Sequence, residues 1–319
     1  MIRRNGGNMA VQIILLGAGF FLLVKGADYF VEGAAGIADR FGIPQLVIGL
    51  TIVAMGTSAP EAAVSMTAAL KGSAGITVGN VIGSNTFNTL AILGITACIV
   101  PLTVAGTTLR FDLPCMLGST ALLLGIGLTG EKITFWESML LLAGFVIYLA
   151  CLFRMAIQER EKGYGESLEN EGENYGMAKL AAMGGVGLLL IIMGSDISVD
   201  AAVKIAGEMG VSERVIGLTI VAVGTSLPEL VTSVSAAAKG KADIAIGNIV
   251  GSNIFNVLFI AGITACITPV PFLEAFIPDT LIAAASGLLL LICVRKKKLT
   301  RAGGALLLTG YIIYFIYLV

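Results

Sequence analysis

The chain has 319 residues, of which 56% are hydrophobic and 13% charged, and its mean hydropathy is +0.94. About a quarter of the residues in a soluble domain are charged, so this composition indicates a protein of the lipid bilayer and excludes a secreted factor, a nucleic-acid-binding protein and a soluble enzyme. The net charge is −1 and there is no histidine, which excludes histidine-based acid–base catalysis and histidine-ligated zinc or copper.

Charges, prolines and polar clusters divide the chain into ten apolar stretches, and one spanning helix needs about 20 apolar residues. The sequence therefore predicts an all-α membrane protein with ten transmembrane helices. The expected ranges are 10–35, 43–70, 75–98, 110–129, 133–156, 177–206, 211–238, 242–267, 278–295 and 301–319. The first stretch runs into further spans without a small-residue cleavage site, so we expect it to remain as a membrane helix.

Basic residues are unevenly distributed over the loops between these stretches. If the loops alternate sides, thirteen Lys and Arg residues fall on one face and six on the other. The positive-inside rule then puts the richer face in the cytoplasm and both termini outside. No transit peptide is apparent, so we expect a multi-pass protein of the cell membrane, plasma or inner.

One loop, 157–176, is long and acidic, with six glutamates among glycines and asparagines. We expect a solvated cytoplasmic linker between two halves of the chain, with a regulatory cation site as the alternative.

The sequence contains an internal repeat. A shift of 168 residues superposes Val47–Pro101 on Val215–Pro269 without a gap, and 36 of these 55 positions are identical. The same shift pairs Asp28 with Asp196, so each copy also includes the helix that precedes it.

Each copy therefore comprises five spans, and we expect two five-helix halves, 1–156 and 177–319. Because five is an odd number, the second half inserts upside down, which gives inverted-topology repeats. This architecture is typical of alternating-access transporters with a site at the bilayer midplane, although channels are also built on inverted repeats.

A glutamate interrupts the second span in the motif GTSAPE (Gly56–Glu61), and another interrupts the seventh in GTSLPE (Gly224–Glu229). Burying an acid at the bilayer centre costs roughly 2.5–3.5 kcal/mol, so an intramembrane acid indicates a functional site. No Lys or Arg lies deep in the second, third, seventh or eighth spans. We therefore expect the counter-ion to be the transported cation.

The proline of each motif removes a helix hydrogen bond and frees a carbonyl oxygen. Residues three or four positions before a glutamate share its helix face, so their hydroxyls are expected to point to one location with the glutamate of their own copy. These hydroxyls belong to Thr57, Ser58, Thr225 and Ser226.

The third and eighth spans carry the facing motifs GNVIGSNTFN (Gly79–Asn88) and GNIVGSNIFN (Gly247–Asn256). In each, a serine and an asparagine four positions apart project together, and the two glycines allow close helix packing. The serine–asparagine pairs are Ser84 with Asn88 and Ser252 with Asn256. Capping or interhelical hydrogen bonding and contact with the ion remain open for Asn80, Asn85, Asn248 and Asn253.

Carboxylates, amides, hydroxyls and freed carbonyls are hard oxygen donors, which suit Ca²⁺ or Na⁺. Mg²⁺ is less favoured because it gives up its water reluctantly. Two negative charges can be neutralised by one divalent ion, by monovalent ions or by protons. A site that exchanges such occupants without standing empty and charged is typical of an antiporter.

The pair GTSAPE…GNVIGSN and GTSLPE…GNIVGSN resembles the signature repeats of the cation/calcium exchanger superfamily, most closely its prokaryotic calcium/sodium antiporters. The motifs cover about 110 residues directly. The resemblance implies a ten-helix inverted-repeat fold that exchanges Na⁺ for Ca²⁺ electrogenically, with no cofactor and no enzymatic activity.

Carried over to this sequence, the resemblance implies a set of ion ligands in which Glu61 and Glu229 are the shared carboxylates. The other implied ligands are the main-chain carbonyls of Ala54 and Ala222, the hydroxyls of Thr57, Ser58, Ser84, Thr225, Ser226 and Ser252, and the amides of Asn88 and Asn256. We expect the ions and the lipid bilayer as partners, and a functional monomer.

The alternatives are other forms of transport. Some K⁺-dependent relatives carry aspartate where this chain has Asn256, and proton-coupled members carry the acid in a GNxxE-type context that neither motif matches. K⁺-dependent and H⁺/Ca²⁺ exchange are therefore less favoured, and a passive channel or an intramembrane hydrolase is less favoured still. In the expected mechanism, the first and sixth helices slide or tilt against the rest, with Asp28, Glu32, Asp196 and Asp200 near the mouths of the ion passages.

Overall fold

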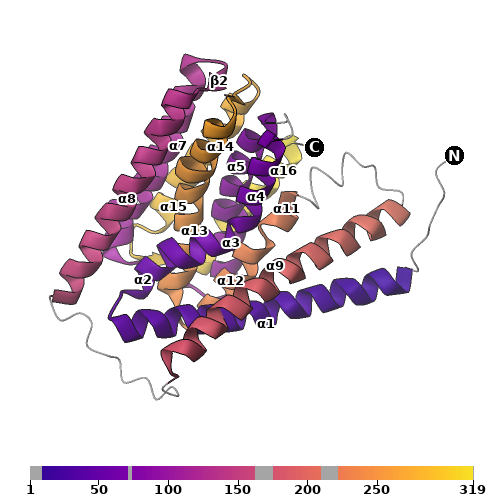
Figure 1. The fold of residues 1–319 in the computed structure, drawn as a ribbon, viewed down its shortest axis with the longest axis vertical. Coiled ribbons are helices and arrows are strands. Elements are labelled where there is room, and N and C mark those ends of the chain that lie inside the picture. The colour runs from indigo at the N-terminus through magenta and orange to yellow at the C-terminus, as the bar shows by residue number, and fades with distance from the viewer. Residues whose placement is uncertain (1–8, 71–73, 162–174, 210–221, 319) are drawn as a thin grey trace.

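The computed structural model describes residues 9–70, 74–161, 175–209 and 222–318, and these residues are almost entirely helical (Figure 1). The α-helices and π-helices are, in chain order, α1 (Met9–Phe41), α2 (Gln45–Ile48), η1 (Gly49–Val53), α3 (Ala54–Thr57), α4 (Ala59–Leu70), α5 (Gly75–Thr86), η2 (Phe87–Ile92), α6 (Leu93–Ile99), η3 (Thr108–Asp112), α7 (Leu113–Thr129), α8 (Phe135–Glu161), α9 (Met177–Glu208), α11 (Ala222–Thr225), α12 (Leu227–Ala238), α13 (Ala242–Phe255), η5 (Asn256–Ala261), α14 (Gly262–Ile267), α15 (Phe276–Cys293) and α16 (Arg301–Leu318).

The predicted class of helical membrane protein is confirmed. Eight helices of the described residues are long and apolar enough to cross a membrane, and a ninth span results when the bent pair Gln45–Thr57 and Ala59–Leu70 counts as one. The predicted span 211–238 lies partly outside the described residues, which contain its part from Ala222 onward.

The first span is longer than the sequence pattern predicts. The expected end was residue 35, but α1 continues to Phe41 and stops at Gly42, whose φ of 61° is left-handed. The Ile43 amide then donates a 2.8 Å hydrogen bond to the Ala38 carbonyl. A glycine just past a helix end is a common terminator, and the charged residues that suggested an earlier end do not by themselves break a helix.

Helices α1 and α9 pack along one another and together extend away from the remaining helices at one end (Figure 1). Their backbones approach so closely that a Cβ added at Gly26 would lie 2.8 Å from the Gly187 carbonyl oxygen. Small residues permit this separation in membrane helices, so the two long helices form a tight pair.

Two spans form the centre of the remaining bundle. The apolar windows of Gly75–Ile99 and Ala242–Ile267 are 78% and 83% buried, against 22% for the α8 span and 17% for α16. Each central span contains one π-helical segment, η2 or η5, at the equivalent place in the repeat. π-helical turns occur often at functional sites, so these two segments indicate a functional region at the centre of the bundle.

Two short antiparallel ladders join the loops at the ends of the bundle. Strand β1 (Leu102–Thr103) pairs with β4 (Lys298–Leu299), and β2 (Lys132–Ile133) pairs with β3 (Val270–Pro271). Each ladder connects a loop of the first half of the chain to a loop of the second, which ties the two halves together outside the central spans.

Candidate ion-binding site

Both glutamate motifs lie at helix breaks. Ser58, with φ −82° and ψ 8°, separates α3 from α4, and the helix bends by 46° there. Ser226, with φ −93° and ψ 8°, separates α11 from α12 in the same way. A proline follows two residues later in each motif and cannot continue the hydrogen-bond ladder. Glu61 and Glu229 consequently lie in the first turns of α4 and α12, where the helix dipole favours negative charge.

The two carboxylates are buried together. Glu61 and Glu229 are each 1% exposed, and they are close enough to interact electrostatically. Neither forms an ion pair among the described residues, where both salt bridges are made by Lys239. Two buried acids without a basic partner are unfavourable in the membrane interior unless a cation or protons neutralise them.

The hydroxyl groups meet the carboxylates across the two copies of the repeat. Ser58 donates a 2.7 Å hydrogen bond to Oε1 of Glu229, and Ser226 donates a 3.2 Å hydrogen bond to Oε1 of Glu61. The expectation that each hydroxyl points with the glutamate of its own copy differs from this arrangement, because the helix breaks at Ser58 and Ser226 and no longer keeps four-residue spacing on one face.

The threonine hydroxyls also lie near the carboxylate of the opposite copy of the repeat. The Thr57 hydroxyl interacts electrostatically with the Glu229 carboxylate, and the Thr225 hydroxyl with that of Glu61. Thr57 also donates a 2.9 Å hydrogen bond to Oδ1 of Asn248. Each carboxylate is thus lined by the hydroxyls of the opposite motif.

A main-chain carbonyl of α3 joins this group. The Ala54 carbonyl oxygen accepts a 3.3 Å hydrogen bond from the hydroxyl of Ser252, which also approaches Glu229. The structure therefore brings Ala54 and Ser252, both expected ligands, to one side of the pair of carboxylates.

Four asparagines at the bundle centre bond to one another in two crossed pairs. Asn88 donates a 3.1 Å hydrogen bond to Oδ1 of Asn253, and Asn256 donates a 3.0 Å hydrogen bond to Oδ1 of Asn85. These bonds use the amide nitrogens of Asn88 and Asn256 and leave their Oδ1 atoms unpaired. Asn85 and Asn253 are thus interhelical hydrogen-bond partners that orient the other two.

Two further asparagines hold the turns that carry the carboxylates. Asn80 donates to the main-chain carbonyl of Glu61 at 3.2 Å and to a serine hydroxyl at 2.9 Å. Asn248 makes the equivalent bonds to the Glu229 carbonyl at 3.3 Å and to a serine hydroxyl at 2.9 Å. The sequence analysis missed the two serines, Ser65 and Ser233, although both copies of the repeat retain a serine four residues after the glutamate.

Several buried oxygen atoms at the site have no hydrogen-bond partner. The acceptor oxygens of this kind at the site are Glu61 Oε2, Glu229 Oε2, Asn88 Oδ1 and Asn256 Oδ1. Almost every buried polar atom in a folded protein is paired, so four such oxygens at one site require an explanation. Oxygen ligands of this type, two of them charged, suit Ca²⁺ or Na⁺.

No hydrogen bond to the rest of the set is described for two expected ligands. Ser84 is 5% exposed on α5, but no hydrogen bond among the described residues links it to another expected ligand. Ala222 begins α11 at the edge of the described residues, and no contact of its carbonyl is described.

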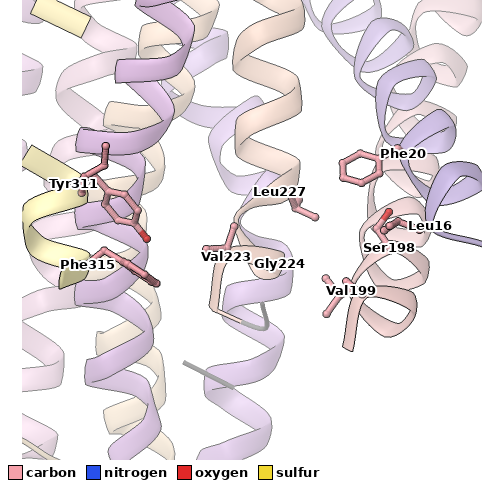
Figure 2. Close-up of a pocket in the computed structure, with 11 residues that line it drawn as sticks. Leu16, Phe20, Ser198, Val199, Val223, Gly224, Leu227, Tyr311 and Phe315 are labelled. Carbon is pink, nitrogen blue, oxygen red and sulfur yellow. The ribbon is translucent and has the colours of Figure 1, made fainter. Parts of the chain in front are cut away.

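An apolar cavity of about 460 Å³ adjoins the second glutamate motif (Figure 2). Residues of α1, α9, α11, α12 and α16 line it, including Phe20, Val199, Leu227 and Phe315. Gly224 of the second glutamate motif forms part of its wall. Among the described residues, its lining includes the hydroxyls of Ser198 and Tyr311 but no carboxylate or amide side chain, so it lacks the charged ligands found at the ion site.

Buried, unpaired acidic and amide oxygens within membrane-spanning helices are typical of the class of membrane proteins that transports cations. The chain belongs to the sodium/calcium exchanger family: the family profile described as "Sodium/calcium exchanger protein" matches residues 11–154 and 179–319. Members of this family are transporters, not enzymes.

Relatives and solved structures agree with this membership. The putative antiporter CaxA of Alkalimonas amylolytica is 40% identical over 82% of this chain and 82% of its own length. The sodium/calcium exchanger MaX1 of Methanosarcina acetivorans is 33% identical over 83% of this chain and 86% of its own. A solved structure of the sodium-calcium exchanger NCX_Mj, soaked with zero Na⁺ and Ca²⁺, is similar with a TM-score of 0.84 and 30% identity over 98% of this chain and 100% of that chain.

Proposed function

We propose that this protein is an antiporter that exchanges Na⁺ for Ca²⁺ across a membrane by alternating access. The observation that carries the proposal is the group of four unpaired buried oxygens from Glu61, Glu229, Asn88 and Asn256. Two of these belong to carboxylates with no basic partner among the described residues. One Ca²⁺ or several Na⁺ ions would neutralise the pair, and occupation by one would exclude the other.

We propose the full set of expected ligands as the ion site. The crossed hydrogen bonds that surround the carboxylates support the hydroxyls of Thr57, Ser58, Thr225 and Ser226 and the carbonyl of Ala54 as ligands. The central position of the amides supports Asn88 and Asn256. The hydrogen bond from Ser252 to the Ala54 carbonyl supports Ser252 as a member of the set. Ser84 and the Ala222 carbonyl are included because they are the repeat counterparts of Ser252 and Ala54.

The proposed architecture is ten spans in two inverted halves, 1–156 and 177–319, joined by the acidic linker 157–176. Contacts that recur with a shift of 168 residues support it, since Ser58 with Glu229 has its counterpart in Ser226 with Glu61. A site assembled from two halves of one chain supports function as a monomer. The basic residues on one face support an orientation with both termini outside, and a 39% identical relative in Escherichia coli, named inner membrane protein YrbG, supports a cell-membrane location.

The test is ⁴⁵Ca²⁺ uptake into proteoliposomes loaded with Na⁺ and diluted into Na⁺-free buffer. We expect uptake that requires the outward Na⁺ gradient and falls to background in Glu61→Gln and in Glu229→Gln. The matched control is Glu274→Gln, which neutralises an exposed glutamate and should retain uptake. Uptake driven only by a pH gradient would instead indicate H⁺/Ca²⁺ exchange, and flux indifferent to both gradients would indicate a channel.

A further inference from the structure

A polar stripe runs along α12 from the ion site to the end of the helix. Thr232, Ser235 and Lys239 follow Glu229 at intervals of three, three and four residues, which keeps them on one side of the helix. At 1.5 Å per residue, Lys239 lies about 15 Å along the axis from Glu229. Thr232 is fully buried and its hydroxyl has no hydrogen-bond partner. The stripe has the character of an ion passage that is closed in this structure.

Helix α1 packs over the stripe, and hydrogen bonds and ion pairs join the two. Ser235 donates a 2.8 Å hydrogen bond to Oδ1 of Asp28, and the Lys239 ammonium donates a 2.8 Å hydrogen bond to the Asp28 carbonyl oxygen. The same ammonium lies 3.3 Å from Oδ1 of Asp28 and 3.8 Å from Oε2 of Glu32. Asp28 and Glu32 are four residues apart on α1, so one lysine pairs with both acids on the same helix face.

The equivalent stripe of the first half is not covered. A shift of 168 residues carries Thr232 and Ser235 onto Val64 and Thr67 of α4. Val64 is 41% exposed, whereas Thr232 is 0% exposed, and Thr67 is also exposed. Helix α9 is the counterpart of α1, but in the described residues it does not pack along α4 as α1 packs along α12. The two halves therefore differ in which stripe is closed.

The ion pairs of Lys239 with Asp28 and Glu32 are weak enough to form and break reversibly. The side chains of Lys239, Asp28 and Glu32 are 30%, 35% and 43% exposed. Ion pairs with this exposure contribute little to the stability of a fold. They still shift an equilibrium between two arrangements of a helix by a few-fold when they form in only one of them.

We infer that Lys239 is a positioning residue of the transport cycle, which holds α1 over the polar stripe of α12 and keeps that side of the ion site closed. The inference rests on the proposed exchange function. The site opens toward the Lys239 side only after the ammonium leaves Asp28 and Glu32. Loss of the lysine charge then favours the arrangement that is open on this side.

The test measures access to the stripe without measuring transport. In a variant without the five native cysteines, Thr232→Cys is exposed to a membrane-impermeant thiol reagent in inside-out and in right-side-out membrane vesicles. We expect Lys239→Gln to raise the modification rate from the Lys239 side by about two- to five-fold, which is the shift that an exposed ion pair can produce. Lys239→Arg, which keeps the charge, should restore the parent rate.

The matched control is Lys179→Gln, which removes an equal charge from α9 and should leave the rate unchanged. Ser235→Cys serves as a second probe of the same stripe if Thr232→Cys does not fold. Equal rates in the parent and in Lys239→Gln would overturn the inference. Because labelling does not depend on Na⁺ or Ca²⁺ flux, a failure of the exchange assay together with a positive labelling result would reject the proposed function and not the role of Lys239.

Discussion

The hydroxyl of Ser58 donates a 2.7 Å hydrogen bond to Oε1 of Glu229, a residue 171 positions away in the chain. Ser226 and Glu61 form the same contact in the opposite direction, at 3.2 Å. Each helix break thus supplies hydroxyls to the carboxylate of the other. An ion bound to either carboxylate would contact both halves of the protein, which couples binding to the relative position of the halves.

Removal of one crossed contact should weaken Ca²⁺ binding. Ser58→Ala deletes a hydroxyl oxygen beside Glu229, and a hydrogen bond to a charged group is worth about 1 kcal/mol or more. We expect the apparent KM for Ca²⁺ to rise about five-fold or more, because about 1.4 kcal/mol corresponds to a factor of ten. The measurement is the Ca²⁺ dependence of Na⁺-driven uptake. Ser119→Ala, which removes a buried hydroxyl bonded to its own helix, should leave KM unchanged.

A third acid at the site should add a proton dependence. The amide nitrogen of Asn256 donates to Oδ1 of Asn85, so the carboxyl of Asn256→Asp can keep this bond only when protonated. Ca²⁺ must displace that proton, so uptake should fall more steeply on acidification than in the parent. The measurement is Na⁺-driven uptake as a function of pH. Asn256→Ser removes the amide without adding an acid, and a pH profile of Asn256→Asp that matches it would contradict the prediction.

The close contact between α13 and η1 should not tolerate a methyl group. A Cβ at Gly251 would lie 2.6 Å from the Leu50 carbonyl oxygen. Overpacking of this kind costs about 1–3 kcal/mol, so Gly251→Ala should lower the thermal unfolding midpoint of the purified protein. Gly118→Ala is the control, because a Cβ there meets no atom within 4 Å and alanine favours the helix. Equal midpoints for the two variants would show that the contact gives way.

Movement of α1 should be required for exchange but not for ion binding. Ser235 of α12 donates a 2.8 Å hydrogen bond to Asp28 of α1, so Asp28→Cys with Ser235→Cys places two thiols at this contact for oxidative cross-linking in a background without native cysteines. We expect the oxidised pair to stop Na⁺-driven Ca²⁺ uptake and to retain Ca²⁺ binding in detergent, with uptake restored by a reductant. Unchanged exchange after complete cross-linking would reject a moving α1.

The sequence by itself was sufficient for the membrane class, the repeat and the choice of chemistry. Hydrophobic stretches of spanning length can be read without knowledge of their neighbours, because the bilayer imposes their length. An acid in such a stretch is costly wherever it lies, which singled out Glu61 and Glu229. The adjacent prolines predicted helix breaks, because a proline lacks an amide hydrogen in any context.

The tertiary structure alone decided which groups meet. Spacing on one helix suggested that Thr57 and Ser58 point with Glu61, whereas the break at Ser58 turns them toward Glu229. For the amides of Asn85 and Asn253, the sequence left open capping or interhelical hydrogen bonding and contact with the ion, and the structure shows interhelical bonds to Asn256 and Asn88.

The contacts that hold α1 on α12 could not be predicted from the sequence. The repeat gives both halves equivalent acids on their first helices, and nothing in it distinguishes Asp28 from Asp196. The difference arises because two similar halves of one chain adopt different packings, so that α1 covers α12 while α9 leaves α4 open among the described residues. Local sequence determines which oxygen-bearing residues lie within the spans, and long-range packing determines which of them meet.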